Sequence, residues 1–194
     1  MRNLFKKKRI EVVKKYLKKK NPIILEIGVH KGDFSQLLLE NFEPEKLVLV
    51  DPWNAESNED YNSSLYGNLH GDGQNIQDSY YNDVLKKFEK EINNSQIEIL
   101  RKKSSDAFRI LNYEFDLIYI DGNHLFEFVI EDINNSLKII KENGYIILDD
   151  YKIVGWWNDG VTKAINKFKE EKKIKIIHQH NFFNKHNQCL IKKI

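Results

Sequence analysis

Residues 23–35 constrain the fold of this chain most strongly, because a short apolar run there leads into two closely spaced glycines. The run Ile-Ile-Leu-Glu-Ile is followed by Gly28, and Gly32 comes four residues later, where a helical pattern begins. A strand, a tight turn and a helix in this order are typical of the carboxyl edge of a parallel sheet, where α/β folds bind nucleotide-like ligands. Glycine has no Cβ, so the backbone can turn sharply and lie close to a ligand.

The spacing in this loop argues against a dinucleotide site. A dinucleotide fingerprint reads G-x-G-x-x-G, whereas this loop reads E-x-G-x-x-x-G and has no third glycine. Glu26 places a carboxylate where a pyrophosphate would need room, so the loop suits a cationic, amine-bearing ligand better. An ordinary turn between a strand and a helix is the alternative for this motif alone.

Length and composition predict one globular domain. The 194 residues are 41% hydrophobic and 12% aromatic, which is enough apolar material for one substantial core. The single Cys189 excludes an internal disulfide framework, and no apolar run reaches bilayer length or resembles a signal peptide. We therefore expect a cytoplasmic protein without a transmembrane segment; the sequence leaves a homo-oligomer open.

Residues 1–20 are strongly basic and are expected to form a helix of their own ahead of a main domain over 21–194. They hold ten Lys or Arg against Glu11, so the rest of the chain is acidic. A basic tip on an acidic body is not typical of a nucleic-acid-binding domain, so we expect no nucleic-acid partner. The helical spacing of Ile10, Val13 and Leu17 predicts an amphipathic helix packed on the domain; contact with an anionic membrane surface is the alternative.

Alternating helix and strand patterns predict an α/β fold, a Rossmann-like, doubly wound sheet that is mostly parallel. Helices are expected over residues 3–19, 33–41, 78–93, 104–111, 125–141 and 159–171. Strands are expected over residues 23–27, 46–51, 96–100, 116–121, 144–149, 173–178 and 187–192. The loop between the last two strands is too short for a crossover helix, which predicts an antiparallel hairpin at one side of the sheet.

The connection over residues 52–77 is long and has little periodicity. Loops beyond about 12–15 residues are usually functional lids or disordered segments. Because it leaves the carboxyl end of the second strand, we interpret it as a lid-like insertion over a substrate, with disorder as the alternative. Trp53, Tyr61 and Tyr66 in this segment suit a sugar or a glycosylated metabolite as the acceptor.

Asp51 closes the second predicted strand, 23 residues after Gly28. An acid at this position can accept hydrogen bonds from both ribose hydroxyls, which favours an adenosine-type ligand. The alternative is a strand-end acid that caps the turn before Pro52.

Three further acids follow apolar strands: Asp121, in the run Ile-Asp-Gly-Asn-His at 120–124, and the pair Asp149 and Asp150. If those strands are neighbours, three carboxylates converge and raise one another's pKa. A divalent cation resolves that repulsion, and an all-oxygen ligand set favours magnesium or calcium over zinc. Asp116 begins its strand, so we expect it at the opposite edge with a structural role.

His124 follows Asp121 by three residues, where the loop turns into a helix. Histidine has a pKa near working pH and could take a proton from a substrate hydroxyl; a helix cap is the alternative. Trp156 and Trp157 follow the acid pair and could exclude water from a site or stack on a planar substrate, although core packing explains them equally well.

Together these motifs resemble those of class I S-adenosylmethionine-dependent methyltransferases. The matching runs are Glu-Ile-Gly-Val-His-Lys-Gly at 26–32, Asp51, Tyr-Ile-Asp-Gly-Asn-His at 119–124 and Leu-Asp-Asp-Tyr at 148–151. More narrowly, the sequence resembles the metal-dependent small-molecule and sugar O-methyltransferases of the macrocin and catechol type. The resemblance extends over about residues 22–170 and implies a seven-stranded sheet with a reversed final strand. Catechol-type enzymes commonly have Asn where this chain has Asp150, which favours the sugar-type branch.

The resemblance also implies roles for single residues. Glu26, Gly28 and Gly32 would hold the methionine part of S-adenosylmethionine and Asp51 its ribose, while Ser105 and Asp106 match the adenine contacts only loosely. Cofactor contacts are further expected from Val29, His30, Ser35 and Asp121. The expected metal ligands are Asp121, Asp149 and Asp150, and the expected catalytic residues are His124 as base with Asp121 and Asp149.

The resulting hypothesis is an S-adenosylmethionine-dependent O-methyltransferase that acts on a hydroxyl of a small molecule or sugar with the help of magnesium. One alternative is an NAD-binding oxidoreductase, against which Glu26 and the missing third glycine argue. The other is a non-catalytic protein of the same fold that binds S-adenosylmethionine without turnover, which the intact acid cluster disfavours.

Overall fold

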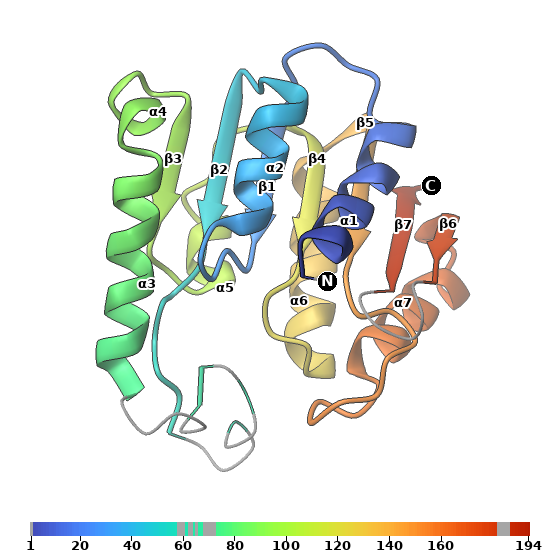
Figure 1. Ribbon diagram of the computed structural model, residues 1–194. Helices are drawn as coiled ribbons and strands as arrows, with labels where there is room; N and C mark the ends of the chain where they lie inside the picture. The colour runs from blue at the N-terminus through green and yellow to red at the C-terminus, as the bar shows by residue number, and fades with distance from the viewer. Residues whose placement is uncertain (1, 58–60, 62–63, 65, 68–72, 182–186) are drawn as a thin grey trace.

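The computed structural model describes residues 2–57, 61, 64, 66–67, 73–181 and 187–194, and of residues 2–7 only the backbone. The strands in these ranges are β1 (Ile23–Ile27), β2 (Lys46–Val50), β3 (Ile97–Leu100), β4 (Phe115–Ile120), β5 (Ile140–Leu148), β6 (Ile174–His180) and β7 (Gln188–Lys193). Within the described residues they form one seven-stranded sheet in the order β3-β2-β1-β4-β5-β7-β6 (Figure 1). Strands β1 to β5 pair in parallel, and β7 runs antiparallel to both β5 and β6. The predicted α/β class and terminal hairpin are therefore confirmed.

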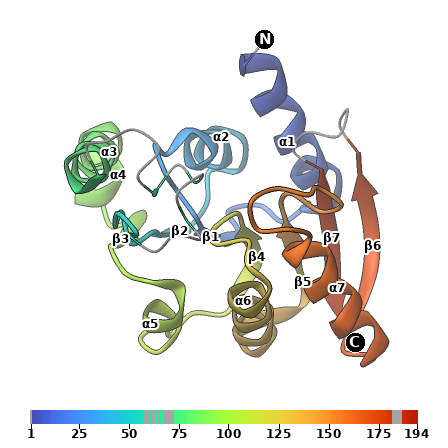
Figure 2. The same cartoon turned by 90° about the horizontal axis from the view of Figure 1, so that it is seen from below.

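Helices cover both faces of the sheet. They are α1 (Arg2–Tyr16), α2 (Asp33–Phe42), α3 (Gly73–Lys87), α4 (Glu89–Asn93), α5 (Ser104–Phe108), α6 (Phe126–Ile139) and α7 (Gly160–Glu170). Seen along the strands, α1, α2 and α3 lie on one face of the sheet, and α5, α6 and α7 lie on the other (Figure 2). This is the doubly wound arrangement that alternating helices and parallel strands produce.

Side chains alternate along each strand between two hydrophobic cores, because successive residues of a strand point to opposite faces. In β4, Ile118 and Ile120 belong to the core under α5, α6 and α7, whereas Leu117 and Tyr119 belong to the core under α1, α2 and α3. Asp121 comes two residues after Tyr119, so it continues the face that α1 covers. Glu26 is two residues after Ile24 and lies on that same face.

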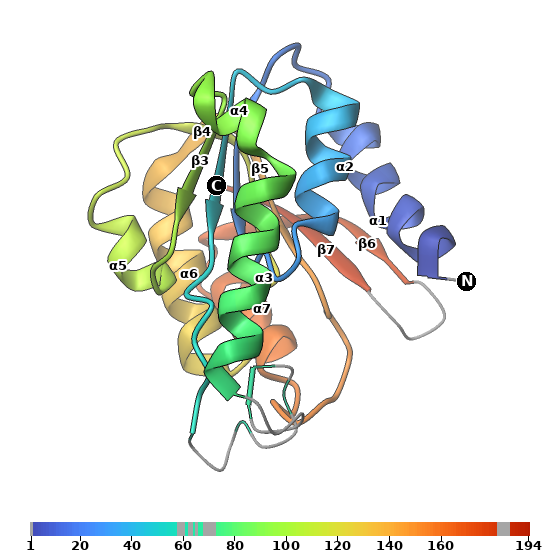
Figure 3. The same ribbon diagram turned by 60° about the vertical axis from the view of Figure 1, so that its left-hand side comes forward.

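The N-terminal helix α1 packs on the sheet through the apolar stripe that its sequence predicts. Ile10, Val12, Val13 and Leu17 are all buried. The helix lies beside α2 and over the part of the sheet that holds β7 and β6 (Figures 2 and 3). The apolar side chains of α1 thus pack on the sheet, and none of the described helices is long and apolar enough to cross a membrane.

The expected helix over 78–93 begins earlier and is interrupted. Helix α3 starts at Gly73, because the Gln74 amide accepts a hydrogen bond from the Ala55 N–H and donates to the Trp53 carbonyl and to Asp78. Residues 73–77 of the predicted connection over 52–77 are therefore helical, while its residues 58–60, 62–63, 65 and 68–72 lie outside the described residues. The buried Phe88 separates α3 from α4.

The boundary between α6 and β5 also differs from the prediction. Helix α6 ends at Ile139, and β5 begins at Ile140, four residues earlier than the expected strand. The pairing with β4 shifts register between Phe115 and Leu117, so the first residues of β5 form an irregular start that apolar periodicity does not reveal.

Asp116 lies at the amino edge of the sheet, opposite the glycine loop. Its carboxylate accepts hydrogen bonds from Lys19 and Lys141, each at 3.0 Å, and from the Ile23 N–H at 2.8 Å. These contacts tie the segment after α1, the start of β1 and the start of β5 together. The structural role expected for Asp116 is confirmed.

Asp132 on α6 carries a buried carboxyl that makes stability depend on pH. Burial raises its pKa to about 7, and the hydrogen bond with Ser104 offsets only part of this effect. In the unfolded chain the carboxyl loses its proton near pH 4. Between pH 4 and pH 7 the folded state therefore binds more protons than the unfolded state, and stability falls as pH rises.

We expect Asp132→Asn to raise the free energy of unfolding at pH 8 by on the order of 2 kcal/mol and to remove most of the fall between pH 4 and pH 7. Urea denaturation at several pH values measures both effects. Glu127→Gln, at an exposed position on the same helix, should leave the pH dependence unchanged. A pH profile for Asp132→Asn that parallels the wild type would contradict this assignment.

Candidate active site

The loop between β1 and α2 is held against the end of β2 by Asp51. One carboxylate oxygen of Asp51 accepts hydrogen bonds from the N–H groups of Val29 and His30, both at 2.9 Å, and the other accepts from the Trp53 N–H at 2.8 Å. His30 has a positive φ of 53°, and its carbonyl accepts a hydrogen bond from the Trp53 indole. Asp51 therefore fixes the loop directly, which the sequence reading did not foresee. The ribose contact expected of it stays a prediction.

Gly28 allows the loop to lie against the end of β4. Its φ is +89°, and a Cβ at this position would lie 2.1 Å from the carbonyl oxygen of Asp121. Its N–H donates to the Val50 carbonyl, and the Asp121 N–H donates to the Ile27 carbonyl. The glycine is needed because the end of β1 and the residue after β4 are in backbone contact, which also joins the glycine loop to the acid cluster.

Glu26 is buried beneath this loop. The Ser35 hydroxyl donates a hydrogen bond of 2.5 Å to its carboxyl group, and burial raises the pKa of Glu26 to about 8. Among the described residues no Lys, Arg or His forms an ion pair with Glu26. A positive charge brought next to this buried carboxyl would favour its ionised form.

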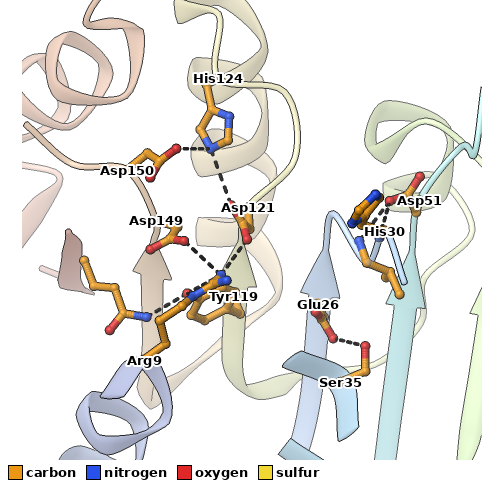
Figure 4. A network of polar contacts seen from close by, with 12 residues as sticks. Arg9, Glu26, His30, Ser35, Asp51, Tyr119, Asp121, His124, Asp149 and Asp150 are labelled. Carbon is orange, nitrogen blue, oxygen red and sulfur yellow. Dashed lines mark hydrogen bonds and ion pairs between the residues drawn. The ribbon is translucent and has the colours of Figure 1, made fainter. Parts of the chain in front are cut away.

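The acids after β4 and β5 meet, as the sequence predicts, but around an arginine (Figure 4). Nη2 of Arg9, on α1, lies 2.5 Å from Oδ2 of Asp121 and 2.9 Å from Oδ2 of Asp149. The same guanidinium donates hydrogen bonds to the Tyr119 hydroxyl at 2.9 and 3.1 Å. The Tyr119 hydroxyl also accepts one from Gln188 on β7.

The two carboxyl groups respond to this environment in opposite directions. Burial and the charges of Asp121 and Asp150 raise the pKa of Asp149, with Arg9 opposing them. Burial also acts to raise the pKa of Asp121, but Arg9 and His124 outweigh it and hold that pKa below its usual value. Asp121 is therefore the ionised member of the pair near neutral pH, and Asp149 retains its proton more readily.

The expected magnesium ligands do not fit a metal ion in this arrangement. The position between Asp121 and Asp149 is filled by the Arg9 guanidinium, which contacts one oxygen of each carboxylate. In the part of the chain that the structure describes, no group of three His, Cys, Asp or Glu side chains is placed to hold a metal ion. Asp150 points instead toward His124, with 3.9 Å between Oδ2 and Nε2.

His124 lies at the edge of the acid cluster. Its Nε2 is 3.6 Å from Oδ1 of Asp121, and its ring lies 4.9 Å from that of Trp157. Burial lowers the pKa of His124, but Asp121 and Asp150 outweigh burial and raise it above the ordinary value. Asp150 adopts a positive φ of 56°, a conformation that costs energy for a residue with a side chain and recurs at functional sites.

Aromatic side chains from two loops gather next to His124. The Tyr61 ring is 5.3 Å from that of Trp156, and the Tyr66 ring is 5.9 Å from it. Trp156 contacts Trp157, and the Asn123 amide donates a hydrogen bond of 2.8 Å to the Tyr61 hydroxyl. The described part of the predicted lid is thus in contact with the loop after β5.

Ser105 and Asp106 lie on α5, away from these contacts. The Asp106 carboxylate is exposed and pairs with Arg109 at 3.3 Å. Among the described residues no contact links this pair to the glycine loop. Their role at an adenine ring stays a prediction.

Arg9 is the site residue that sequence reasoning missed. It is one of ten cations in the first twenty residues, and charge alone does not single it out. The signal that could have found it is helical spacing: Arg9 shares a face with Val12, Val13 and Tyr16, so it continues the buried stripe of α1. A cation on the apolar face of a helix indicates a buried anionic partner.

The fold is that of the class I methyltransferases. Its features are the strand order, the reversed β7, the glycine loop after β1 and the acids after β2, β4 and β5. The chain belongs to the family described as "Methyltransferase domain", whose model matches residues 25–151.

One relative and several solved structures resemble the chain. An uncharacterized protein of Acanthamoeba polyphaga mimivirus is 27% identical over 150 residues, which are 74% of this chain and 57% of that protein. This chain thus spans little more than half the length of that relative.

A candidate caffeoyl-CoA O-methyltransferase from Staphylococcus aureus matches with a TM-score of 0.67 at 13% identity, over 95% of this chain and 82% of that one. The O-methyltransferase TomG from Streptomyces achromogenes, in complex with SAM, matches with 0.62 at 15% identity, over 89% and 73%. The B. subtilis tRNA methyltransferase TrmK matches with 0.59 at 13% identity, over 96% and 65%. These likenesses concern the fold.

We expect Gly28→Ala to lower the free energy of unfolding by about 1–3 kcal/mol, because a Cβ would collide with the Asp121 backbone at a positive φ. Chemical denaturation measures the loss. Gly122→Ala is the matched control and should cost less, since the atom nearest to its Cβ would be a methyl carbon of Ile27 at 3.3 Å and the nearest backbone atoms would lie at 3.9 Å. Equal stability of the two variants would contradict the close contact between β1 and β4.

Proposed function

We propose that this protein is an S-adenosylmethionine-dependent O-methyltransferase that acts on a hydroxyl group of a small molecule or sugar. The observation that carries the proposal is the position of His124, between Asp121 and Asp150 and against Trp157, at the same sheet edge as the glycine loop. Membership of the methyltransferase-domain family supports methyl transfer. A histidine placed as a base supports transfer to the oxygen of a hydroxyl group.

The residues around the glycine loop fit an adenosine-linked cation. Glu26 offers a buried carboxyl to positive charge, and Asp51 closes the neighbouring strand on the same face of the sheet. When bound, S-adenosylmethionine would supply the methyl group on a sulfonium centre. The chain's part is to hold the donor and the acceptor in line and to exclude water, because a fixed near-attack geometry removes much of the barrier.

His124 would accept the proton of the acceptor hydroxyl. Asp121 and Asp150 favour its protonated form and so stabilise the charge that develops when it takes this proton. The scheme contains no step through a metal ion, because Arg9 lies between the acids that sequence reasoning assigned to magnesium. Arg9 keeps Asp121 ionised next to His124 instead.

The aromatic cluster supports a ring-shaped acceptor. The rings of Tyr61, Tyr66, Trp156 and Trp157 are in contact with one another, and the Trp157 ring lies against His124. Aromatic rings stack on sugars and on planar molecules, and such sites orient ligands with a few fixed hydrogen bonds. The acids beside the cluster repel phosphate, which favours a small neutral acceptor over a nucleic acid.

Calorimetric titration separates the proposed function from its alternatives. We expect S-adenosylhomocysteine to bind with a micromolar dissociation constant and NAD to give no heat. Binding of NAD alone would favour the oxidoreductase and contradict the proposal. Binding of S-adenosylhomocysteine without methyl transfer to any hydroxylated sugar or phenol in a broad screen would favour the non-catalytic binding protein.

We expect His124→Ala to lower kcat/KM by about 10²–10⁴ while leaving S-adenosylhomocysteine binding intact, as for a lost general base. In the wild type, kcat/KM should rise with pH as His124 loses its proton, at a pH above 6.5 because its pKa is raised. Asp150→Asn removes a negative charge beside the ring, lowers this pKa and should move the rise to lower pH.

The control for this pH profile is Asp159→Asn. The Asp159 carboxylate pairs with Lys163, so the substitution removes the same charge from a side chain whose ion pair is with Lys163 and not with His124. A profile for Asp150→Asn that coincides with the one for Asp159→Asn would show that His124 is not the titrating base.

A further inference from the structure

The cation at the centre of the acid cluster belongs to the chain itself. The Arg9 side chain is only 15% exposed, and its Nη2 contacts Oδ2 of both Asp121 and Asp149. The guanidinium also donates to the Tyr119 hydroxyl and lies over the Phe34 ring, 4.8 Å from the ring centre. Neighbours from β4, β5 and α2 thus surround it.

The surrounding structure holds Arg9 in this place. Ile10 and Val13, on the same helix, are 3% and 1% exposed, so α1 is packed on the sheet directly beside the arginine. The Tyr119 hydroxyl that receives the guanidinium is itself fixed by a 2.7 Å hydrogen bond from the buried Gln188. A surface arginine in chance contact with an acid would have neither support.

A guanidinium and a divalent cation cannot both occupy this position. Asp121 and Asp149 follow β4 and β5 at neighbouring register positions, since Ile120 pairs with Leu148. Their two Oδ2 atoms already contact a single nitrogen of Arg9. A magnesium-like ion would need the same oxygen atoms at about 2.1 Å. Each cation therefore satisfies the acids only in the absence of the other.

We propose that Arg9 is the resident counter-ion of Asp121 and Asp149 and that it excludes divalent cations from them. Arg9 acts as a positioning residue: it neutralises the acid pair and holds Asp121 beside His124. A metal ion enters only when Arg9 is replaced or α1 moves away. This inference concerns the acid pair and stands independently of the proposed methyl transfer.

The test is the binding of Mn²⁺ to the full chain, followed by the loss of the electron paramagnetic resonance signal of the free ion. We expect Arg9→Gln to bind one Mn²⁺ at least ten times more tightly than the wild type does. Lys14→Gln is the matched control, because Lys14 is an exposed cation of the same helix. The double variant Arg9→Gln with Asp149→Asn should lose the gain, which places the ion at the acid pair.

Two results would overturn the proposal. The first is equal Mn²⁺ affinity of Arg9→Gln and Lys14→Gln, and the second is tight binding by the wild type that Asp149→Asn abolishes. Folding of Arg9→Gln only in the presence of Mn²⁺ would support it. If Arg9→Gln does not fold at all, Arg9→Met decides, because Met fills much of the space of the arginine stem and carries no charge. A folded Arg9→Met without a gain in Mn²⁺ affinity would reject the proposal.

Titration of the same samples with S-adenosylhomocysteine reports the proposed function separately. A variant that gains Mn²⁺ and keeps S-adenosylhomocysteine binding supports both proposals. A gain of Mn²⁺ in a protein that never binds S-adenosylhomocysteine supports the role of Arg9 and counts against the methyltransferase proposal.

Discussion

Buried carboxylates on adjacent strands must share positive charge, and much of this site is arranged around that requirement. Asp121 and Asp149 stand next to each other because β4 and β5 are parallel neighbours in the sheet. Arg9 meets one side of the pair and His124 lies at the other. Gly28 allows the loop after β1 to lie in backbone contact with Asp121, so the proposed ligand loop is directly next to the acids. We therefore expect a substitution at one of these contacts to alter the geometry of the others.

Because side chains alternate along each strand, the residues of the candidate site lie on one face of the sheet, and the other face is used for packing. Glu26 and the residues leading to Asp121 belong to the face that α1, α2 and α3 cover. The opposite face is packed by α5, α6 and α7 with mainly apolar side chains, and the buried Asp132 lies on α6. This division explains why Glu26 and Asp132, whose pKa values are both raised by burial, have separate consequences: one concerns the proposed ligand binding and the other stability.

Sequence reasoning predicts the sheet well because strand runs such as 116–121 are apolar on both faces, and that pattern depends only on local residues. It also places Asp121 and Asp149 at one edge, since parallel strands end together. It fails where the local structure depends on a side chain that is distant in the sequence. Gln74 extends α3 through contacts with residues 53 and 55. Asp51 accepts hydrogen bonds from the N–H groups of the glycine loop. Arg9 is the largest omission, because its partners are more than a hundred residues away along the chain.

The N-terminal segment is attached to β4 at both of its ends. Arg9 pairs with Asp121 after the carboxyl end of the strand, and Lys19 pairs with Asp116 at its amino end. These two ion pairs set the position of α1 along the strand, while its apolar stripe sets the distance from the sheet. Two ion pairs therefore link the N-terminal segment to the residues at the two ends of β4. A fusion partner or surface attachment ahead of α1 can exert a force on the helix. Through Arg9, that force would reach the carboxylate of Asp121 beside His124.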